Sequence, residues 1–331
     1  MNHLFLFILI SISLIDPISN YEPPYSRYSL LLGKVRKDIV KSSMLNLPKR
    51  QNVNILQMLI SMADEKEKSN LTDIEAAFLI YMWIGENIKI NCYNRYVKDE
   101  SAIIVYNSGE GSVIGISSLF NTMCSHMKIQ SGSIIGFNKM KSSTSFLKYI
   151  ETEHMWNYIL VDNIKYLIDS SLGTGFCNDS VFTKEYTNLF FGTKPEILIK
   201  THFPKDEEFQ LLDKNITQYD WKKIVSRDRY FYLYGLINIY PENEYIYLKK
   251  VDKITIEYDT SNYDFSVIGQ IFYNDRFGVE VIFNQVTYKK GIAELSLNNW
   301  NIYSAPIRLE IYVGKKKNPW EKLSVVYSTQ T

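Results

Sequence analysis

The sequence predicts an α+β protein in which helices and antiparallel strands form one domain and an all-β, sandwich-like domain follows. Apolar residues recur every three or four positions up to about residue 127, as in amphipathic helices. From Ser131 they occur in short strand-like runs, and beyond Lys205 such runs alternate with turn-prone pieces such as "NDRFG" and "YKKG". The expected divisions are a signal peptide at 1–20, a helical lead-in at 21–68, an α+β domain at 69–215 and a β-rich domain at 225–331.

The first twenty residues are expected to be a secretory signal peptide. The stretch "MNHLFLFILISISLIDPISN" places an apolar run from Leu4 to Leu14 behind a short polar start, and the helix breaker Pro17 follows it. This run of eleven residues falls short of the roughly 20 that are needed to span a bilayer. We therefore expect a secreted or extracellular protein without an integral membrane segment once the signal is removed.

The charge balance disfavours a nucleic-acid partner. The 37 lysines and arginines nearly cancel the 36 aspartates and glutamates, so the net charge is +1. The 25 tyrosines and 17 phenylalanines could stack on bases, but such platforms normally lie in a basic groove. The one basic run that stands out, Lys315 to Lys317, is interpreted as a solvated turn.

Apolar spacing and a capping signal predict the lead-in and the helix after it. "VNILQMLISMAD" has apolar residues at helical spacing before a charged stretch. In "TDIEAAFLIYMWIGENI", Thr72 and Glu75 have the spacing of a capping box, in which each side chain bonds the other residue's backbone N–H. The apolar residues of this helix fall on one face, so we expect it to pack into the core.

A second buried helix is expected from Val113 to about Met127, after the glycine loop "GEGS". Ser112 directly precedes this helix and is a candidate N-cap, where a hydroxyl accepts a backbone N–H. The apolar residues that recur at intervals of three or four are Val113, Ile116, Phe120, Met123 and Met127.

The strands "HMWNYILV" and "KYLID" are expected to form a hairpin. Asp162 and Asn163 separate them and are a good turn pair. If these two residues make up the loop, Val161 faces Ile164, and the numbers of facing residues always sum to 325.

His154 and Asp169 are expected to meet on this hairpin. His154 then faces Ser171, and Asp169 lies two residues from Ser171 on the same strand. Diagonal neighbours of this kind are roughly 7 Å apart between backbones, which is within side-chain reach. A carboxylate that accepts a proton from a histidine ring fixes its tautomer, which is the orienting half of a Cys-His-Asp triad. The alternative is a structural pair that satisfies two polar groups in a partly buried sheet.

A series of motifs in order gives the pair its context. Between about 80 and 212 the chain contains "WIGENIKIN" from Trp83, "GSVIGISSLFNTMC" to Cys124, "GFNK" from Gly136, "HMWN" from His154, "YLIDSSLGTG" from Tyr166, "FFGTKPE", and "HFPKDEEFQLL" from His202. In content and order these motifs resemble the transglutaminase-like proteins with a papain-like core, and within them the branch that includes kyphoscoliosis peptidase. The β-rich tail is similar to that branch's C-terminal domain. The resemblance implies a papain-like α+β core.

The resemblance carries the family's histidine onto His154 and its aspartate onto Asp169, but it carries no cysteine. In the family the cysteine stands two residues before a glycine that here is Gly115, so its position is Val113. A thiolate at this position would be stabilised by the helix N-terminus and by a charged His154. The isopropyl group of Val113 cannot attack a substrate.

Four other residues are weighed as a displaced nucleophile. Ser112 lies one residue earlier, which is a rotation of about 100° on a helix, so we favour its capping role. Cys124 lies eleven residues beyond Val113, about 16 Å further along the helix axis. Cys92 and Cys177 lie outside the matching motifs, and at most one bridge can form within the chain.

No metal or cofactor is expected. His126 and His202 have no metal-ligand partner at short spacing, His3 belongs to the signal segment, and neither an HExxH motif nor paired CxxC motifs occur. Trp156, beside His154, is expected either to form a wall of the cleft or to fill the core.

The first functional hypothesis is an exported pseudoenzyme that keeps His154 and Asp169 and binds a protein or peptide partner. The alternative is an active peptidase or acyl transferase that uses Ser112 or another nucleophile with His154 as base. A third hypothesis, which overlaps the first, is a structural extracellular protein whose β domain does the binding.

Overall fold

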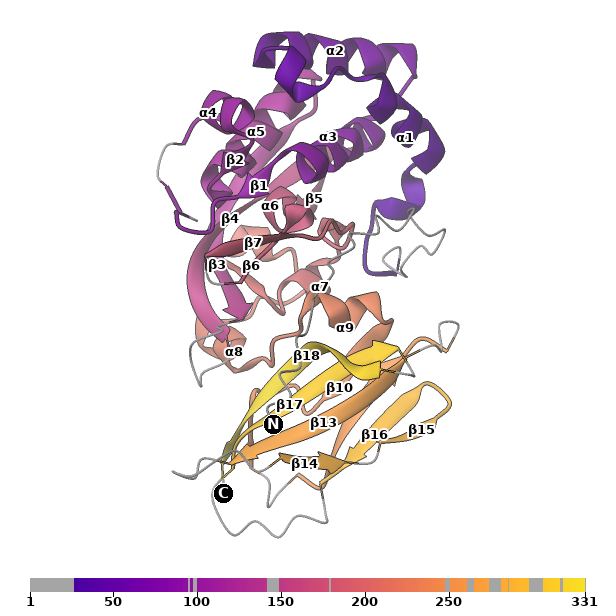
Figure 1. Cartoon of the computed structure of the whole chain (residues 1–331), viewed down its shortest axis with the longest axis vertical. Helices are drawn as coiled ribbons and strands as arrows, with labels where there is room; N and C mark the ends of the chain where they lie inside the picture. Colours follow the sequence, from indigo (N-terminus) through magenta and orange to yellow (C-terminus); the bar gives the residue numbers. More distant parts are fainter. Residues whose placement is uncertain are drawn as a thin grey trace, which may run out of the picture.

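The computed structural model describes residues 27–330, apart from 95, 98–99, 142–148, 179, 248–250, 261–264, 274–280, 285, 298–305 and 316–317. The predicted signal peptide and most of the lysine run therefore lie outside the described residues. Figure 1 shows a part rich in helices, coloured indigo to salmon, and below it a part made of orange and yellow strands. This arrangement confirms the predicted α+β class with a mostly β C-terminal part.

In the described part of the chain, five α-helices precede the central sheet. They are α1 (Lys37–Asn46), α2 (Ile55–Lys68), α3 (Asp73–Asn87), α4 (Ala102–Ser108) and α5 (Val113–His126). Helix α3 begins with the predicted capping box, because Thr72 Oγ1 accepts the N–H of Glu75 at 3.2 Å and Glu75 Oε2 accepts the N–H of Thr72 at 3.0 Å. Most of α3 is buried, so it forms the centre of the helical layer.

Glu75 also connects α3 to α1. Its carboxylate is 1% exposed and accepts hydrogen bonds from Nε and Nη2 of Arg36, each at 2.6 Å, and from the backbone N–H of Arg36 at 2.9 Å. One side chain therefore caps a helix and fixes the start of another.

Helix α5 begins at Val113, as predicted. Ser112 is its N-cap, since the hydroxyl accepts the N–H of Gly115 at 3.1 Å. The backbone N–H of Ser112 in turn donates to Glu100 Oε2 at 2.6 Å. Residues at the predicted apolar spacing are buried, so α5 runs through the core between α3 and the sheet.

The central sheet is antiparallel, with the strand order β8-β5-β4-β3-β9. Its strands are β3 (Ser131–Lys141), β4 (Tyr149–Val161), β5 (Ile164–Ile168), β8 (Phe191–Thr193) and β9 (His202–Pro204). Helix α5 packs against β3 and β4.

The β4–β5 hairpin has the predicted register at its turn, where Val161 pairs with Ile164. Asp162 and Asn163 have φ of 51° and 62°, the left-handed values that a two-residue turn requires. The predicted pairing of His154 with Ser171 is wrong, however. The strand pairing ends earlier because the chain leaves the sheet after β5 and forms helix α6 (Ser170–Thr174).

A disulfide joins two short segments beside the sheet. Strands β1 (Lys89–Ile90) and β2 (Glu110–Gly111) pair in parallel, and β6 (Gly175–Asn178) and β7 (Val181–Lys184) form a hairpin. Cys92, just after β1, is bonded to Cys177 in β6. Cys124 is free and buried in α5.

The C-terminal part is a sandwich of two sheets, with the orders β10-β12-β16-β15 and β11-β18-β17-β13-β14. Three short helices, α7 (Pro195–Leu198), α8 (Gln218–Lys223) and α9 (Arg229–Leu233), precede it. Its strands are β10 (Leu236–Tyr240), β11 (Tyr245–Tyr247), β12 (Lys253–Tyr258), β13 (Ser266–Tyr273), β14 (Val281–Asn284), β15 (Val286–Lys289), β16 (Ile292–Ser296), β17 (Pro306–Lys315) and β18 (Asn318–Gln330). The two sheets pack face to face, since Leu295 of β16 lies against Gly269 of β13.

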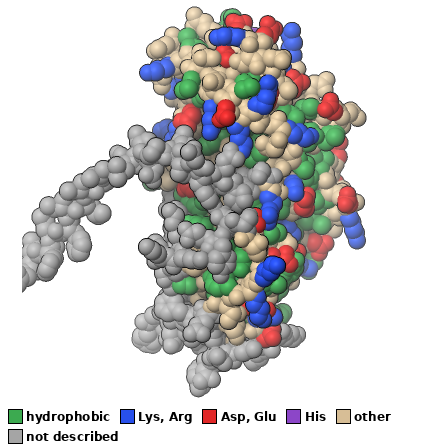
Figure 2. Space-filling model, turned by 90° about the vertical axis from the view of Figure 1, so that its right-hand side faces the viewer, with side chains coloured by type: hydrophobic (Ala, Val, Ile, Leu, Met, Phe, Trp, Pro, Cys, Tyr) green, Lys and Arg blue, Asp and Glu red, His purple; other side chains and the backbone are tan. Residues whose placement is uncertain are grey.

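The described surface has no large region of one charge in the view of Figure 2, where acidic and basic side chains are interspersed. In the described ranges, no helix combines the length and the apolar character needed to cross a membrane.

Glu75→Gln tests the link between α1 and α3. The substitution keeps the shape of the side chain but removes the charge that strengthens its hydrogen bonds to Arg36. We expect it to lower the free energy of unfolding at neutral pH by about 1–2 kcal/mol. The hydrogen bonds from Arg36 hold the pKa of Glu75 at about 2, below its ordinary 4.5. This contribution is therefore complete above pH 4.5 and is lost as the pH falls toward 2. Urea unfolding of both proteins at a series of pH values measures it.

The matched control is Asp73→Asn in the same first turn of α3. Asp73 is half exposed and pairs with Lys66 at 2.6 Å, so we expect a loss below about 0.5 kcal/mol. Equal losses for the two variants would contradict the role given to Glu75.

Candidate functional site

The structure brings His154 and Asp169 together in the interior. His154 lies on β4 and is 2% exposed, and its Nε2 is 2.5 Å from Oδ2 of Asp169. Asp169 follows β5 and is the N-cap of α6, where its Oδ1 accepts the N–H of Leu172 at 2.9 Å and the hydroxyl of Ser171 at 2.7 Å. The contact was predicted from strand register, but the cap of α6 is what positions the carboxylate.

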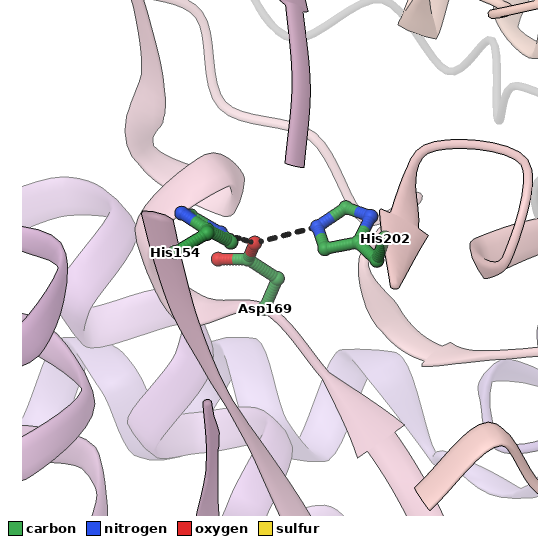
Figure 3. A group of neighbouring side chains, drawn as sticks. All are labelled: His154, Asp169 and His202. Carbon is green, nitrogen blue, oxygen red and sulfur yellow. Dashed lines mark hydrogen bonds and ion pairs between the residues drawn. The ribbon is translucent and has the colours of Figure 1, made fainter. Parts of the chain in front are cut away.

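His202 is a third member of the cluster, a position that was not predicted from the sequence. It lies on β9, and its Nε2 is 3.1 Å from Oδ2 of Asp169, on the side opposite His154 (Figure 3). In the neutral tautomer that donates to Asp169, its Nδ1 accepts the hydroxyl of Thr201 at 2.8 Å. Strand β9 is adjacent to β3 and not to β5, so local spacing did not indicate the contact. The available signal was the "HFPKDEEFQLL" motif that begins at His202.

Asp169 and His202 both have shifted pKa values. Burial alone would raise the pKa of Asp169, but the charge and hydrogen bond of His154, together with His202, outweigh it and hold this pKa well below its usual range. Burial lowers the pKa of His202, which Asp169 only partly offsets. Asp169 is therefore a buried carboxylate that accepts from imidazole N–H groups on two sides.

The second ring nitrogen of His154 points away from Asp169 (Figure 3). When the neutral imidazole donates from Nε2 to Asp169, Nδ1 is an acceptor. This atom makes no hydrogen bond to any described residue. The imidazole is thus oriented by the carboxylate on one side and available to a ligand on the other.

A cavity of about 350 Å³ contains both His154 and Val113. Val113 is at the first position of α5, so the cavity reaches the N-terminal end of that helix. The lining side chains are mainly apolar, and they are Ile90, Tyr96, Val113, Thr152, Glu153, His154, Leu172 and Cys177. The residue that stands at the expected cysteine position and the retained histidine therefore share one cavity.

Three other candidate site residues lie outside this cavity. Ser112 is fully buried and caps α5, and it is not among the residues that line this cavity. Cys124 is buried within α5, and burial raises the pKa of its thiol far above the ordinary value. His126 is exposed at the end of the same helix. None of these three provides a reactive group beside His154.

Trp156 packs behind the cavity and does not line it. The ring is 1% exposed, and its centroid lies 6.1 Å from that of His154 and 5.2 Å from that of His202. Of the two roles weighed for Trp156, the structure supports the packing role, so the cleft-wall assignment is corrected. The indole packs against both imidazoles.

The position of Cys177 in the cavity wall was not predicted from the sequence. The sequence offered no reason to place it near the site, but β6 brings it into the cavity wall, where it is disulfide-bonded to Cys92. The bonded partners are 85 residues apart, and no local pattern connects them.

A buried polar network fixes the elements around the cavity. Asn157 of β4 donates to the carbonyl of Ser117 at 3.1 Å and to its hydroxyl at 2.8 Å. Ser170 of α6 donates to Oδ1 of Asn157 at 3.0 Å. This network links α5, β4 and α6, the three elements that contain Val113, His154 and the Asp169 cap.

The cluster of His154, Asp169 and His202 has the residue types of a metal site, with one ligand atom of each within 4.8 Å of the others. The separations of 2.5 and 3.1 Å from Oδ2 are hydrogen-bond distances, and in the tautomers that donate to Asp169 each Nε2 atom carries a proton. Hydrogen bonding thus accounts for the arrangement, and an ion would have to displace both protons.

Comparison with known proteins agrees with the geometry. The family model of the transglutaminase-like superfamily matches residues 60–168, which contain α5 and His154. Kyphoscoliosis peptidase of Homo sapiens is 27% identical over 183 residues, which cover 53% of this chain and 27% of the relative. The Mus musculus protein of the same name is 26% identical over 183 residues, with the same coverage.

A more distant relative, hillarin of Drosophila melanogaster, is 22% identical over 211 residues, covering 56% of this chain and 26% of hillarin. The chain spans about a quarter of the length of these curated relatives. Together with the α+β core described above, the matches show that this chain contains a transglutaminase-like domain, and they support the branch that includes kyphoscoliosis peptidase.

Proposed function

We propose that the protein is a transglutaminase-like pseudoenzyme that binds a protein or peptide partner. The observation that carries the proposal is Val113 at the start of α5, in the same cavity as His154. General base catalysis needs an acidic group within about 3 Å of the imidazole, and a valine side chain supplies none. The retained His154–Asp169 pair can still hold a ligand.

The cavity's chemistry supports a peptide ligand. Its volume of about 350 Å³ is in the range of ligand pockets, and its walls are mainly apolar. Nδ1 of His154 offers one oriented hydrogen-bond acceptor. An apolar side chain next to a backbone N–H matches both features, so we propose this as the recognised element.

The alternative, an enzyme that uses Ser112, has weaker support. The Ser112 hydroxyl accepts the N–H of Gly115 and is fully buried. Acting as a nucleophile would require it to give up the helix cap and to turn toward a cavity that it does not line.

Export is part of the proposal. The apolar segment within residues 1–20 has the pattern of a signal peptide. The Cys92–Cys177 disulfide is consistent with folding in an oxidising compartment.

The first test restores a thiol with Val113→Cys. We expect the wild-type protein to show no amidase, peptidase or transglutaminase turnover above background. The introduced thiol should react with iodoacetamide at least about tenfold faster than the buried thiol of Cys124, because the helix end and His154 both favour the thiolate. Mass spectrometry of alkylated peptides measures the rate at each cysteine.

The matched control is Ile114→Cys, which is at the same end of α5 but borders a different groove, away from His154. Adding His154→Gln should slow alkylation in the Val113→Cys protein and leave it unchanged in the Ile114→Cys protein. The pseudoenzyme proposal fails if the wild type turns over substrate and both Ser112→Ala and His154→Ala abolish that turnover.

The second test concerns binding. Peptides selected on the wild-type protein from a displayed library should bind Val113→Phe at least about tenfold more weakly, because the larger ring occupies the cavity; this is about 1.4 kcal/mol. Ile114→Phe is the control and should retain the affinity. Calorimetric titration provides the dissociation constants, and equal affinity for all three proteins would place the binding surface elsewhere.

A further inference from the structure

The cavity beside His154 contains sulfur although Val113 does not supply it. Cys177 of β6 lines the cavity, whereas its disulfide partner Cys92 is not among the lining residues. Cys92 lies in a surface segment after β1, next to Tyr93, which is 82% exposed. Both cysteines are partly exposed. We call the sulfur of Cys177, the residue that lines the cavity, the inner sulfur and that of Cys92 the outer sulfur.

His154 is the group in this cavity that can exchange a proton with the inner sulfur. Its ring is 2% exposed, its Nε2 is committed to Asp169, and its Nδ1 has no partner among the residues described. Glu153 also borders the cavity, but its carboxylate pairs with Lys205 at 3.1 Å on the surface. A proton leaving or reaching the sulfur of Cys177 thus has one oriented imidazole to exchange with.

We propose that Cys92–Cys177 is a redox-active disulfide served by the His154–Asp169 pair. A thiolate of an external dithiol attacks the sulfur of Cys92, the S–S bond breaks, and Cys177 leaves as a thiolate. The second thiol of the reductant then releases Cys92. The cysteine pair gains two electrons and two protons, and the reductant becomes a disulfide.

The assignment of leaving group follows from stabilisation of the thiolate. Thiol–disulfide exchange is faster when the departing sulfur is the better-stabilised anion. A protonated His154, held by Asp169, stabilises an anion at Cys177 but not at Cys92, which does not line the cavity. Attack at the outer sulfur is therefore favoured by the leaving group.

Reduction then produces a thiol on Cys177 in the cavity that His154 lines, with Asp169 bonded to the far side of the imidazole. The sulfur is supplied by β6 and not by α5. The inference uses the same cavity as the proposed function and goes beyond it, because it concerns the reduced protein. The oxidised protein, with both sulfurs bonded, remains without a nucleophile.

The experiment compares the two sulfurs as single free thiols. Cys92→Ser leaves Cys177 free, and Cys177→Ser leaves Cys92 free. At about pH 6 we expect iodoacetamide to alkylate Cys177 about fivefold faster than Cys92, since thiolate stabilisation outweighs the accompanying loss of nucleophilicity. His154→Gln keeps an N–H for Asp169 but cannot take up a proton. It should remove the advantage of Cys177 and leave the rate at Cys92 unchanged.

A second measurement covers the case in which a cysteine variant does not fold. The wild-type protein is reduced with dithiothreitol under native conditions and pulsed with iodoacetamide, and both cysteine peptides are quantified from the same molecules. The inference would be overturned by equal alkylation rates at the two cysteines, or by an alkylation rate at Cys177 that His154→Gln leaves unchanged. Turnover by the oxidised wild type would instead overturn the proposed function, so the two failures are distinguishable.

Discussion

The buried carboxylate of Asp169 is the constraint on which the site depends. An ionised carboxylate in the interior is costly unless donors surround it. Here it accepts from His154 and His202 on one oxygen, and from Ser171 and the N–H of Leu172 on the other. These donors belong to β4, β9 and α6, so the carboxylate is satisfied only when the sheet and the short helix have assembled. The orientation of His154 is therefore a consequence of the complete fold.

Helix α9, which precedes the β sandwich, contributes to the same assembly. Arg229 of α9 is buried and donates to the carbonyls of Gly175 at 2.9 Å and Glu185 at 3.1 Å. These contacts hold the segment that follows α6. Leu172 of α6 and Cys177 of β6 in this region line the cavity. The family model ends at residue 168, before this wall. The wall formed by Leu172 and Cys177 thus lies where the core meets the residues that lead into the β sandwich.

Several elements could be predicted from the sequence because short-range contacts determine them. The capping box of Thr72 and Glu75 and the N-cap role of Ser112 depend on residues within three positions of each other. The turn at Asp162 and Asn163 depends on the tolerance of these two residues for left-handed backbone angles. Periodicity of two or about 3.6 residues then indicated the α+β class, because each period places apolar side chains on one face.

The tertiary structure alone decided how the site is built. The predicted hairpin placed Asp169 near His154, as observed, but the reasoning was incomplete. Strand register does not show where a strand ends and a helix begins. His202 joins the cluster through a strand that is not adjacent to β5. Cys177 reaches the cavity wall on β6 and is bonded there to Cys92, 85 residues away. The sequence alone determined which segments fold locally and which residue types they present. Only the packed chain determines which distant side chains share a cavity, because that depends on contacts that no local period encodes.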